Sequence, residues 1–439
     1  MQAGFTLLEA GSTGVTSVTS ILFKNVADVF VGAIAWFAVG YAVAYGDDGS
    51  EEQLKFLGRG YFFMNNVGLC EYANWFYQWT FAATAVTIVS GAMAGRTKLS
   101  AYIVYSTLLT AFVYPAVVHW TWSGNAWLAS GNFDDDEVGY SDFAGSGIVH
   151  MTGGMAALVG AYFVGPRGTA AFENYADKAE IPGHSMPFVA LGTFILFFGF
   201  IGFNGGSVLS AGDAAMPIMG LAVVNTVMAA SGGGVMAEVL NMLICKHRYW
   251  SLIQMCNGGI AGMVAICAGA NVVYPWAAFV IGLGGGAAFK LTSHLVHRAG
   301  IDDAIDAAAV HLGPGFWGLI AVAFFAMDPA DEPSMGHDFG GIFYGGGKDA
   351  WNRLGWNIAG ALVICVWTGT LTSIMFGMLS KFGMLRVDDR ILDSAGGLDF
   401  AEHGEMAYVY HAVSNEHRHD DVGNSMSESA PGVITITKC

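Results

Sequence analysis

Two histidines occupy matching positions in two separate apolar segments of the sequence. Asp142 is followed eight residues later by His150, and Asp303 is followed eight residues later by His311. A neutral imidazole can both donate and accept a hydrogen bond, so two that meet can hold a small polar solute or pass a proton. Because an ionisable side chain inside a bilayer is costly and usually functional, this repeated unit predicts a paired-histidine site in a duplicated membrane protein.

The spacing within the unit predicts where each residue lies. Eight residues correspond to about 12 Å of helix, so we expect each aspartate near a helix start and its histidine deeper. An aspartate there caps the helix and complements its dipole. Capping is the favoured role for Asp303, whereas capping and an electrostatic role near a substrate are equally open for Asp142. A zinc site needs three or four ligands and only the two histidines are visible, so we expect no metal and no cofactor.

The composition is that of a membrane protein. Hydrophobic residues make up 54% of the 439 residues and charged residues only 12%, which is about half the charged share of a soluble domain. The six cysteines show no paired spacing, so no disulfide framework is indicated. Apolar runs close to the ~20 residues that cross a bilayer recur along the chain. Ten spans are predicted near residues 25–45, 72–94, 99–121, 144–164, 186–205, 214–244, 251–270, 273–296, 304–327 and 355–382.

The first eleven residues are apolar but cover only about half of a crossing. They contain no basic stretch or cleavage site, which argues against a signal peptide. We expect residues 1–11 to end a first transmembrane helix whose beginning is missing, and a helix on the membrane surface is the alternative. The fold class expected is therefore an all-α polytopic membrane protein with about eleven transmembrane helices, the first of them incomplete.

The helix count gives the duplication a geometry. If residues 1–11 end the first span, the histidine units begin the fifth and tenth spans. Five helices per copy place the copies in opposite orientation, as a five-plus-five inverted repeat with its substrate path at the repeat interface. We expect a transporter domain over residues 1–382 and a cytoplasmic tail over residues 383–439. Within the domain, repeat one spans about 1–165, repeat two about 186–327 and the last helix about 355–382.

Charge placement orients the spans. Basic residues, among them Lys24, Arg96 and Arg167, fall in alternate loops, whereas acidic clusters such as residues 134–137 fall on the other side. The positive-inside rule therefore predicts a cytoplasmic C-terminus and an N-terminus outside. The net charge of −17 reflects mainly these acidic outer loops and the tail.

Several motifs together resemble the ammonium transporter (Amt/Rh/MEP) family, specifically its eukaryotic Amt-type members. The resemblance extends from residue 1 to about residue 411, and it implies membrane transport rather than enzymatic activity. The motifs are Met-Gln-Ala-Gly-Phe with Leu-Leu-Glu-Ala-Gly (1–11), Tyr-Gln-Trp-Thr-Phe-Ala (77–82), His-Trp-Thr-Trp-Ser (119–123), Asp-Phe-Ala-Gly-Ser-Gly-Ile-Val-His (142–150), Gly-Phe-Asn-Gly-Gly-Ser (202–207), Asp-Asp-Ala-Ile-Asp-Ala-Ala-Ala-Val-His (302–311) and the tail residues 397–408.

The resemblance implies two aromatic sites at the outer end of a pore. Phe81, Trp122 and Ser207 match an outer site that recruits ammonium, and Tyr77 occupies another outer aromatic position. Aromatic faces attract a cation as it loses water, by up to about 2 kcal/mol or more. Phe81 and Phe203 match a stacked phenyl gate below that site, which would hinder hydrated ions.

The same resemblance implies that His150 and His311 line the pore as a proton relay, with Asp142 close to the recruitment site. The predicted function is capture of NH₄⁺ outside, deprotonation near the gate, and conduction of NH₃ with the proton passed separately through the histidines. A simple hole would not separate NH₄⁺ from K⁺, which is similar in radius. Loss of a proton gives a neutral species that crosses apolar space far more cheaply.

The sequence departs from the family pattern at four positions. Leu312 adds bulk next to a pore histidine, and Pro314 removes a helix hydrogen bond. Phe200 stands where an indole is common, and these three changes bear on conduction rate rather than fold. Ala401 replaces the regulatory threonine of plant relatives, which excludes phosphorylation there.

The resemblance also implies partners and a location. We expect ammonium or ammonia as substrate with methylammonium as analogue, a lipid bilayer, a homotrimer, a cytoplasmic regulator at the tail, no nucleic acid, and a multi-pass protein of the plasma membrane. The main alternative is an ammonium sensor (a transceptor) with little or no flux. An intramembrane enzyme with a histidine-bound metal and a gas channel of the Rh branch are less favoured, because two ligands are few and Trp122 matches the Amt branch.

Overall fold

The computed structural model describes most of the chain as helices joined by short loops. The described residues are 1–47, 56–130, 138–167, 183–210, 212–244, 249–330, 340–392, 394 and 396–408. No strand is formed within these ranges, apart from two isolated bridges. The end of the expected cytoplasmic tail, residues 409–439, lies outside them.

The first half of the chain contains seven α-helices in the described residues. Two π-helical segments make their spans continuous: η2 (Trp36–Gly40) joins α2 to α3, and η4 (Leu109–Val113) joins α5 to α6. A third, η5 (Ser146–Met151), leads into α7 and carries His150. The helices are α1 (Gln2–Ser12), α2 (Val18–Ala35), α3 (Tyr41–Tyr45), α4 (Glu71–Ala92), α5 (Leu99–Leu108), α6 (Tyr114–Trp122) and α7 (Thr152–Val164).

The second half contains five helices before the long α13 and two short tail helices. Local sequence signals set several starts: Ser185 and Ser251 cap α8 and α10 by accepting backbone N–H groups, and Pro275 begins α11. The helices are α8 (Met186–Gly206), α9 (Ala215–Ile244), α10 (Leu252–Ile266), α11 (Pro275–Arg298), α12 (Ala307–Phe325), α13 (Gly347–Lys381), α14 (Asp389–Leu392) and α15 (Gly397–His403).

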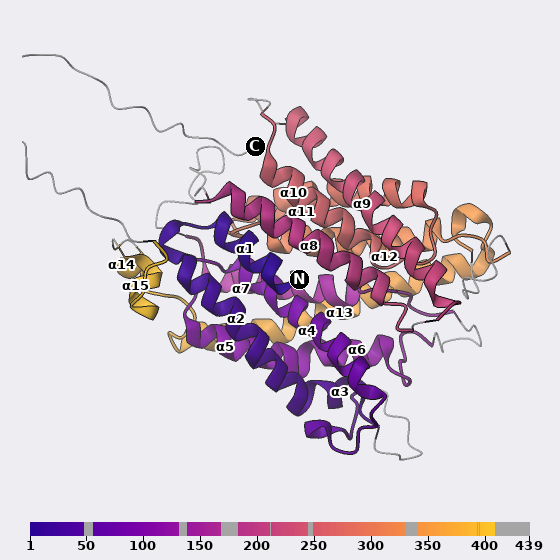
Figure 1. The fold of residues 1–439 in the computed structure, drawn as a ribbon, viewed down its shortest axis with the longest axis horizontal. Coiled ribbons are helices and arrows are strands. Elements are labelled where there is room, and N and C mark those ends of the chain that lie inside the picture. Colours follow the sequence, from indigo (N-terminus) through magenta and orange to yellow (C-terminus); the bar gives the residue numbers. More distant parts are fainter. Residues whose placement is uncertain are drawn as a thin grey trace, which may run out of the picture.

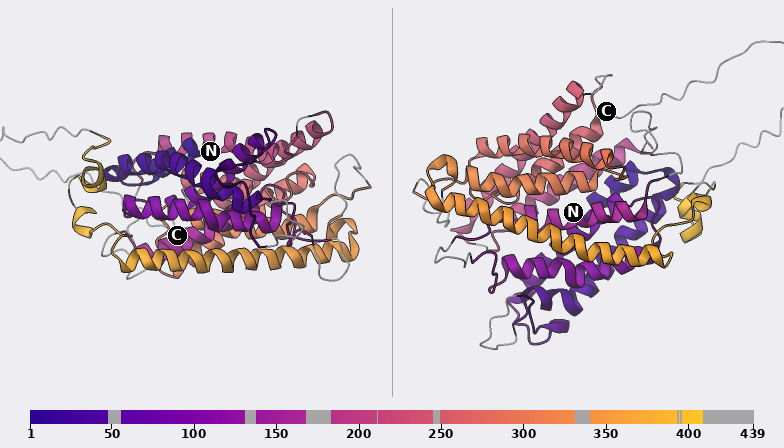
Figure 2. Two further views of the ribbon diagram at one scale, coloured as in Figure 1. Left: turned by 90° about the horizontal axis from the view of Figure 1, so that it is seen from below. Right: turned by 180° about the vertical axis from the view of Figure 1, so that it is seen from behind.

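The helices lie side by side along the longest axis of the molecule, with the loops gathered at its two ends (Figure 1). We call the end that carries α14 and α15 the tail side; both helices are seen there in each view of Figure 2. The long α13 runs along the outside of the bundle (Figure 2). Polar loops at two ends of an apolar bundle are what a membrane-spanning protein requires.

The packing of the helices repeats between the halves. Equivalent helices meet across the centre: α1 packs on α8, and η5 and α7 pack on α12. The cross-pairs also match, because α4 contacts α12 and α10 contacts η5. Within each half, α4 packs on α7 as α10 packs on α12. This paired arrangement is the one expected for two related five-helix units.

Each predicted span coincides with a helical segment, but some boundaries differ. In the described residues eight helices are long and apolar enough to cross a membrane. The span predicted to begin at residue 25 begins earlier, with a continuous helical stretch over Val15–Tyr45, and α13 begins before the predicted residue 355. The prediction that Lys24 lies in a loop was wrong. It lies within α2, buried, where the Lys24 Nζ atom donates to the Thr97 carbonyl oxygen at 2.6 Å. That hydrogen bond stabilises a charged side chain inside the span, whereas hydropathy alone had placed Lys24 outside it.

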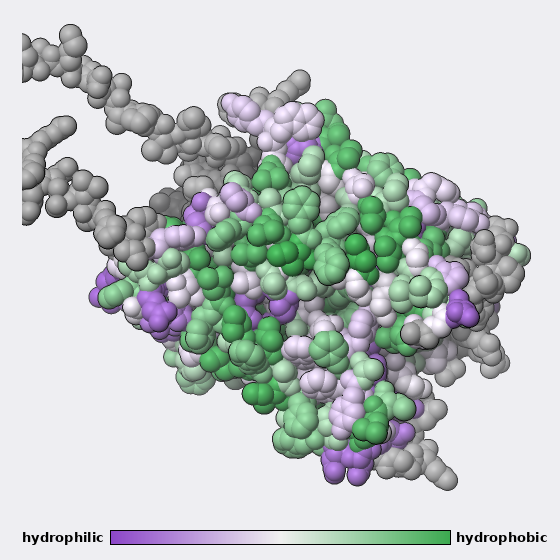
Figure 3. Space-filling view, viewed as in Figure 1, coloured by the Kyte–Doolittle hydropathy of each residue, from purple (hydrophilic) through white to green (hydrophobic). Residues whose placement is uncertain are grey.

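Large apolar side chains cover the outside of the bundle. Hydrophobic residues fill the middle of the face in Figure 3, and hydrophilic residues gather mostly toward its edges. Phe194 and Phe198 on α8 are 73% and 76% exposed, and Leu243 on α9 is 72% exposed. Apolar surface on this scale is suited to lipid or to a neighbouring subunit rather than to water.

Candidate functional site

The two histidines meet at the centre of the bundle. The Nδ1 atoms of His150 and His311 are 3.2 Å apart, and their rings are stacked with centroids 5.1 Å apart and planes 16° apart. Both side chains are buried, at 0% and 3% exposure. Since one Nδ1 must donate and the other accept, the pair forms a hydrogen bond through which a proton can pass.

An aspartate holds the start of each histidine-bearing helix, as the spacing predicts. Asp142 accepts four backbone N–H groups, at 2.8 to 3.0 Å, and a hydrogen bond from the Tyr140 hydroxyl. The four donors are Gly145, Ser146, Gly147 and Ile148. Asp303 accepts only two such groups, from Ala307 at 2.8 Å and Ala309 at 3.2 Å. The two caps are therefore equivalent in position and unequal in strength.

A pair of phenyl rings covers one end of the histidine pair. Phe81 on α4 and Phe203 on α8 are stacked, with ring centroids 4.0 Å apart and planes 27° apart. The Phe203 ring also lies 5.5 Å from the His150 ring. Both phenyl side chains are buried. The two rings separate the histidines from the cavity beyond them.

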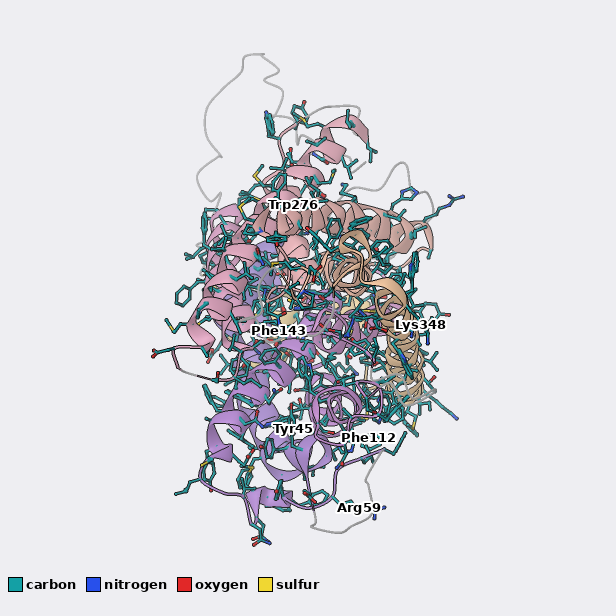
Figure 4. All side chains as sticks on the ribbon, turned by 90° about the vertical axis from the view of Figure 1, so that its right-hand side faces the viewer. Tyr45, Arg59, Phe112, Phe143, Trp276 and Lys348 are labelled. Carbon is teal, nitrogen blue, oxygen red and sulfur yellow. The ribbon has the colours of Figure 1, made fainter. Side chains whose placement is uncertain are left out.

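Beyond the phenyl pair lies a cavity of about 600 Å³, which we call the aromatic cavity. It is on the side of the molecule away from the tail. Phe81 forms its floor, and Trp122 meets Phe81 edge to face with centroids 5.7 Å apart. Figure 4 labels two of its wall residues, Tyr45 and Phe143. The walls also include Asn74, Tyr77, Gln78, Thr121, Tyr140, Ser141, Asp142, Ser207, Leu209, Asn271 and Val272.

Hydrogen bonds fix the polar side chains of the aromatic cavity. The Trp122 indole N–H donates to the Asp142 carbonyl oxygen at 2.9 Å, so its ring cannot rotate freely. The Tyr77 and Ser207 hydroxyls both donate to the Phe203 carbonyl oxygen, at 2.6 and 2.8 Å. Because its only proton is engaged, the Ser207 oxygen keeps lone pairs that can accept an N–H from a solute.

Three residues near the histidines were not predicted as site residues. The Cys267 sulfur lies 3.5 Å from His150 Nε2, which places a thiol at the second nitrogen of that ring. Phe200 stacks on His150 with centroids 5.6 Å apart, and Phe5 lies 6.2 Å from His311. The sequence gives no signal for these contacts, because nothing in a run of apolar residues indicates which side chain will face a histidine. In the part of the chain that the structure describes, no three His, Cys, Asp or Glu residues are grouped to hold a metal ion.

A second, smaller cavity touches His311 from the tail side. It holds about 20 Å³, and we call it the Glu9 cavity after its acidic residue. That volume is enough for about one water molecule. Its polar lining comes from Glu9, Thr87, Asn257 and His311, and the remaining lining is apolar: Phe5, Leu8, Ile88, Gly91, Ile260, Ile305, Ala307 and Val310.

Three of the four departures from the family pattern lie around the histidines rather than in the cavities, and the fourth, Ala401, lies on α15. Leu312 lines neither cavity and packs against Gly154 of α7, where an added Cβ would meet the Leu312 nitrogen at 2.7 Å. Pro314 is buried inside an unbroken α12. Phe200 faces His150, as described above.

The described part of the tail docks on the tail side of the bundle. The Asp399 carboxylate on α15 accepts backbone N–H groups of Thr19 and Ser20 at 3.0 and 2.8 Å, at the start of α2. Glu402 accepts the Leu99 N–H at 3.2 Å, at the start of α5. Two tail carboxylates thus cap two helices of the bundle.

The chain matches one family along almost its whole length. The model of the Ammonium Transporter Family matches residues 1–408. The putative ammonium transporter 1 of Caenorhabditis elegans is 40% identical over 425 residues, covering 94% of this chain and 77% of the relative. Ammonium transporter 1 member 1 of Arabidopsis thaliana is 35% identical, covering 94% and 83%.

Solved structures give the same result. A "Sensor Amt Protein" has a TM-score of 0.78 at 31% identity, covering 92% of this chain and 94% of that chain. Saccharomyces cerevisiae Mep2 has a TM-score of 0.77 at 27% identity, covering 90% and 86%.

Proposed function

Since this chain belongs to the ammonium transporter family, we propose that it transports ammonium across a membrane along the path from the aromatic cavity to the paired histidines. The observation that carries the proposal is the order of three features along one line. An aromatic cavity comes first, a stacked phenyl pair second and a buried imidazole pair third. Each suits one stage: capturing a cation, excluding its water and handling its proton.

Capture takes place against the aromatic rings. A cation that leaves water for the aromatic cavity gains up to about 2 kcal/mol from a ring face. Trp122 and Phe81 supply the faces, Tyr77 adds a third ring, and the Ser207 oxygen accepts one N–H of ammonium. A potassium ion can also be attracted by the rings and by the hydroxyl oxygen, but it has no hydrogen to donate and so gains no hydrogen bond there.

The phenyl pair then favours a neutral species. Phe81 and Phe203 close the path with apolar surface, which a charged or hydrated solute crosses at high cost. Ammonium can give up its proton on the cavity side and continue as NH₃. Potassium has no such route, so selectivity follows from the acid–base chemistry of the substrate.

The histidine pair serves the proton and the ammonia together. A proton that reaches His150 can pass along the Nδ1–Nδ1 hydrogen bond to His311, while NH₃ bonds to the imidazole edges. Cys267 is the neighbour of the remaining His150 nitrogen, and Phe200 keeps water from that face of the ring. Asp142 and Asp303 hold the two helix starts and so fix the distance between the rings.

The central test removes both imidazoles. A His150→Ala/His311→Ala variant should lose methylammonium uptake by about 100-fold, in line with the loss of a positioned proton-transfer group. Uptake of labelled methylammonium is measured in yeast that lack their own ammonium transporters, and is normalised to the protein at the surface. Residual uptake should also lose its preference for ammonium over potassium. Uptake and selectivity equal to those of the unaltered chain would contradict the proposal.

A second candidate is an ammonium sensor with little or no flux. The similarity to the solved "Sensor Amt Protein", which is 31% identical to this chain, supports this candidate. The same uptake assay separates the two. A sensor would bind ammonium at the aromatic cavity without accumulating methylammonium in the cells.

The assembly and location follow the same proposal. We propose a homotrimer in the plasma membrane, with the aromatic cavity outside, the N-terminus outside and the C-terminus cytoplasmic. The exposed apolar faces of α8 and α9 support contact with lipid or a neighbouring copy, and the basic residues of the tail-side loops support the orientation. The docked tail, residues 397–403, would be the place for a cytoplasmic regulator to act.

A further inference from the structure

Glu9 is a buried carboxylic acid that the proposed path does not yet use. It lies on α1 at 0% exposure. Its Oε2 atom accepts hydrogen bonds from the Asn25 amide at 3.0 Å and the Ser90 hydroxyl at 2.9 Å. Its Oε1 atom has no hydrogen-bond partner among the described residues. An acid at this depth with one oxygen unused is costly, and such residues commonly mark proton or ion paths.

The Glu9 cavity connects this acid to the histidine pair. Glu9 and His311 both line it, and its volume of about 20 Å³ fits one bridging water molecule. Phe5, one helical turn before Glu9 on the same face of α1, lies 6.2 Å from His311 between ring centroids. The Glu9 carboxyl group therefore lies on α1 one helical turn closer to the tail side than Phe5.

The geometry of the imidazoles gives the connection a direction. His311 uses Nδ1 toward His150, so its other nitrogen, Nε2, is the one available on the cavity side. A proton that enters the pair on His150 leaves it most directly from His311 Nε2. Histidine alone does not complete a path to water, because His311 is only 3% exposed.

We propose that Glu9 is the proton acceptor that follows His311, so that a buried carboxylate extends the proton path by one step toward the tail side. This inference rests on the proposed function. Ammonium releases NH₃ and one proton at the aromatic cavity, and that proton passes from His150 to His311. The His311 Nε2–H bond then breaks as an O–H bond forms on Glu9 Oε1, directly or through one water molecule. The Glu9 O–H bond then breaks as the proton passes on toward the tail side, where it joins NH₃ to re-form NH₄⁺, so that charge and atoms balance.

The charges around Glu9 suit an acid that gains and loses a proton. Lys24 and Asp28 on α2 are the charged groups that interact with it. Asp28 has both oxygens engaged: Oδ1 with the Ser106 hydroxyl, and Oδ2 with Thr87 and Gln2. Asp28 also lines neither cavity. Of the two buried acids, Glu9 alone has both a free oxygen and access to the Glu9 cavity in the described structure.

The test measures charge moved per molecule of tracer. Ammonium-evoked current and labelled methylammonium uptake are recorded on the same oocytes, and surface protein is quantified. Glu9→Gln keeps the shape and the Asn25 and Ser90 contacts but cannot accept a proton, so the ratio of current to uptake should fall by about tenfold or more. Glu9→Asp retains an acid one methylene further from the cavity, and its ratio should lie between those of the wild type and Glu9→Gln. Asp28→Asn is the matched control, and its ratio should stay at the wild-type value.

The outcomes separate this inference from the proposed function. A wild-type ratio in Glu9→Gln overturns the role of Glu9 and leaves ammonium transport intact. An equal fall of the current-to-uptake ratio in Asp28→Asn also overturns it, because the effect then comes from the combined charge of Glu9, Lys24 and Asp28. Should Glu9→Gln fail to reach the surface, Glu9→Asp decides: a reduced ratio supports the role and a wild-type ratio overturns it. A wild type that takes up tracer without current carries no proton, which overturns this inference and the histidine relay but leaves ammonium transport intact, whereas a wild type with neither signal overturns the proposed transport as well.

Discussion

The two sides of the histidine pair differ in the chemistry that lines them. On one side, α4, α6 and the loops that precede η5 and follow α8 surround a cavity of about 600 Å³ with tyrosine, tryptophan and phenylalanine rings. On the other side, α1, α4, α10 and α12 leave about 20 Å³ lined mostly by apolar side chains, with one acid, Glu9, among its few polar groups. The helix packing repeats between the halves, whereas the side chains that line the two cavities differ: one cavity offers aromatic faces and the other a carboxylic acid. The helix caps at Asp142 and Asp303 also differ, in the number of backbone N–H groups that each accepts. Substitutions at the two caps can therefore measure the difference between the two halves.

The largest expected effect comes from breaking the stronger cap. Asp142→Ala removes the acceptor of four backbone N–H groups in a buried loop, each costing about 1–3 kcal/mol when left unpaired. We expect a loss of about 3–5 kcal/mol of stability, partly relieved by water entering from the aromatic cavity. Asp303→Ala removes two such bonds and should cost about half as much. Thermal unfolding of the purified protein in detergent measures both. Equal losses would show that the two caps do not differ as their hydrogen bonds indicate.

A smaller effect, on the apparent KM for ammonium, is expected from removing an aromatic ring of the aromatic cavity. Trp122→Leu keeps bulk but loses the cation–π attraction, so the apparent KM for ammonium should rise by about tenfold or slightly less. Phe5→Leu, on the Glu9 side of the pair, should leave the KM measured from the aromatic side unchanged. Concentration dependence of the ammonium-evoked signal, normalised to surface protein, gives both values. A matching rise in the Phe5 variant would mean that the two mouths are not distinct in recruiting the cation.

The smallest effect on transport is expected at Leu312. Its side chain packs against Gly154 between the halves and lines neither cavity. Leu312→Ala should therefore change methylammonium uptake by less than about twofold, while costing about 1 kcal/mol of stability through lost packing. An uptake several times faster than wild type would instead show that this leucine narrows the path itself.

Sequence patterns predicted the features of this molecule that depend on long apolar runs or on repeated motifs. Hydropathy located each span, and the spacing of Asp142 to His150 and of Asp303 to His311 predicted both caps and the central meeting of the rings. The stacking of Phe81 on Phe203 followed from family resemblance alone, since a phenylalanine in an apolar run carries no local signal.

What the sequence did not predict depends on which side of a helix faces which neighbour. Hydropathy averages over many residues, so it placed Lys24 in a loop although one carbonyl bond suffices to hold it within α2. Glu9 belonged to a segment assessed for its length and its family motif, and neither marks a carboxylate that faces a histidine. Cys267 was assessed for pairing with other cysteines rather than for contact with a histidine. The π-helical turns are a further case, because one extra residue in a turn shifts every later side chain without altering composition.

The glycines where the two halves cross have a consequence for how solutes can move. A Cβ on Gly154 would meet the Leu312 backbone, and one on Gly315 would meet the Ser146 carbonyl oxygen, so main chain lies directly on main chain at both crossings. Many duplicated carriers work by rocking one half against the other to open alternate sides. Here such a swing would have to separate backbones that touch at the very point where the imidazoles meet. Under the proposed function, the permeant and its proton would therefore move through a stationary frame, helped by small side-chain rotations.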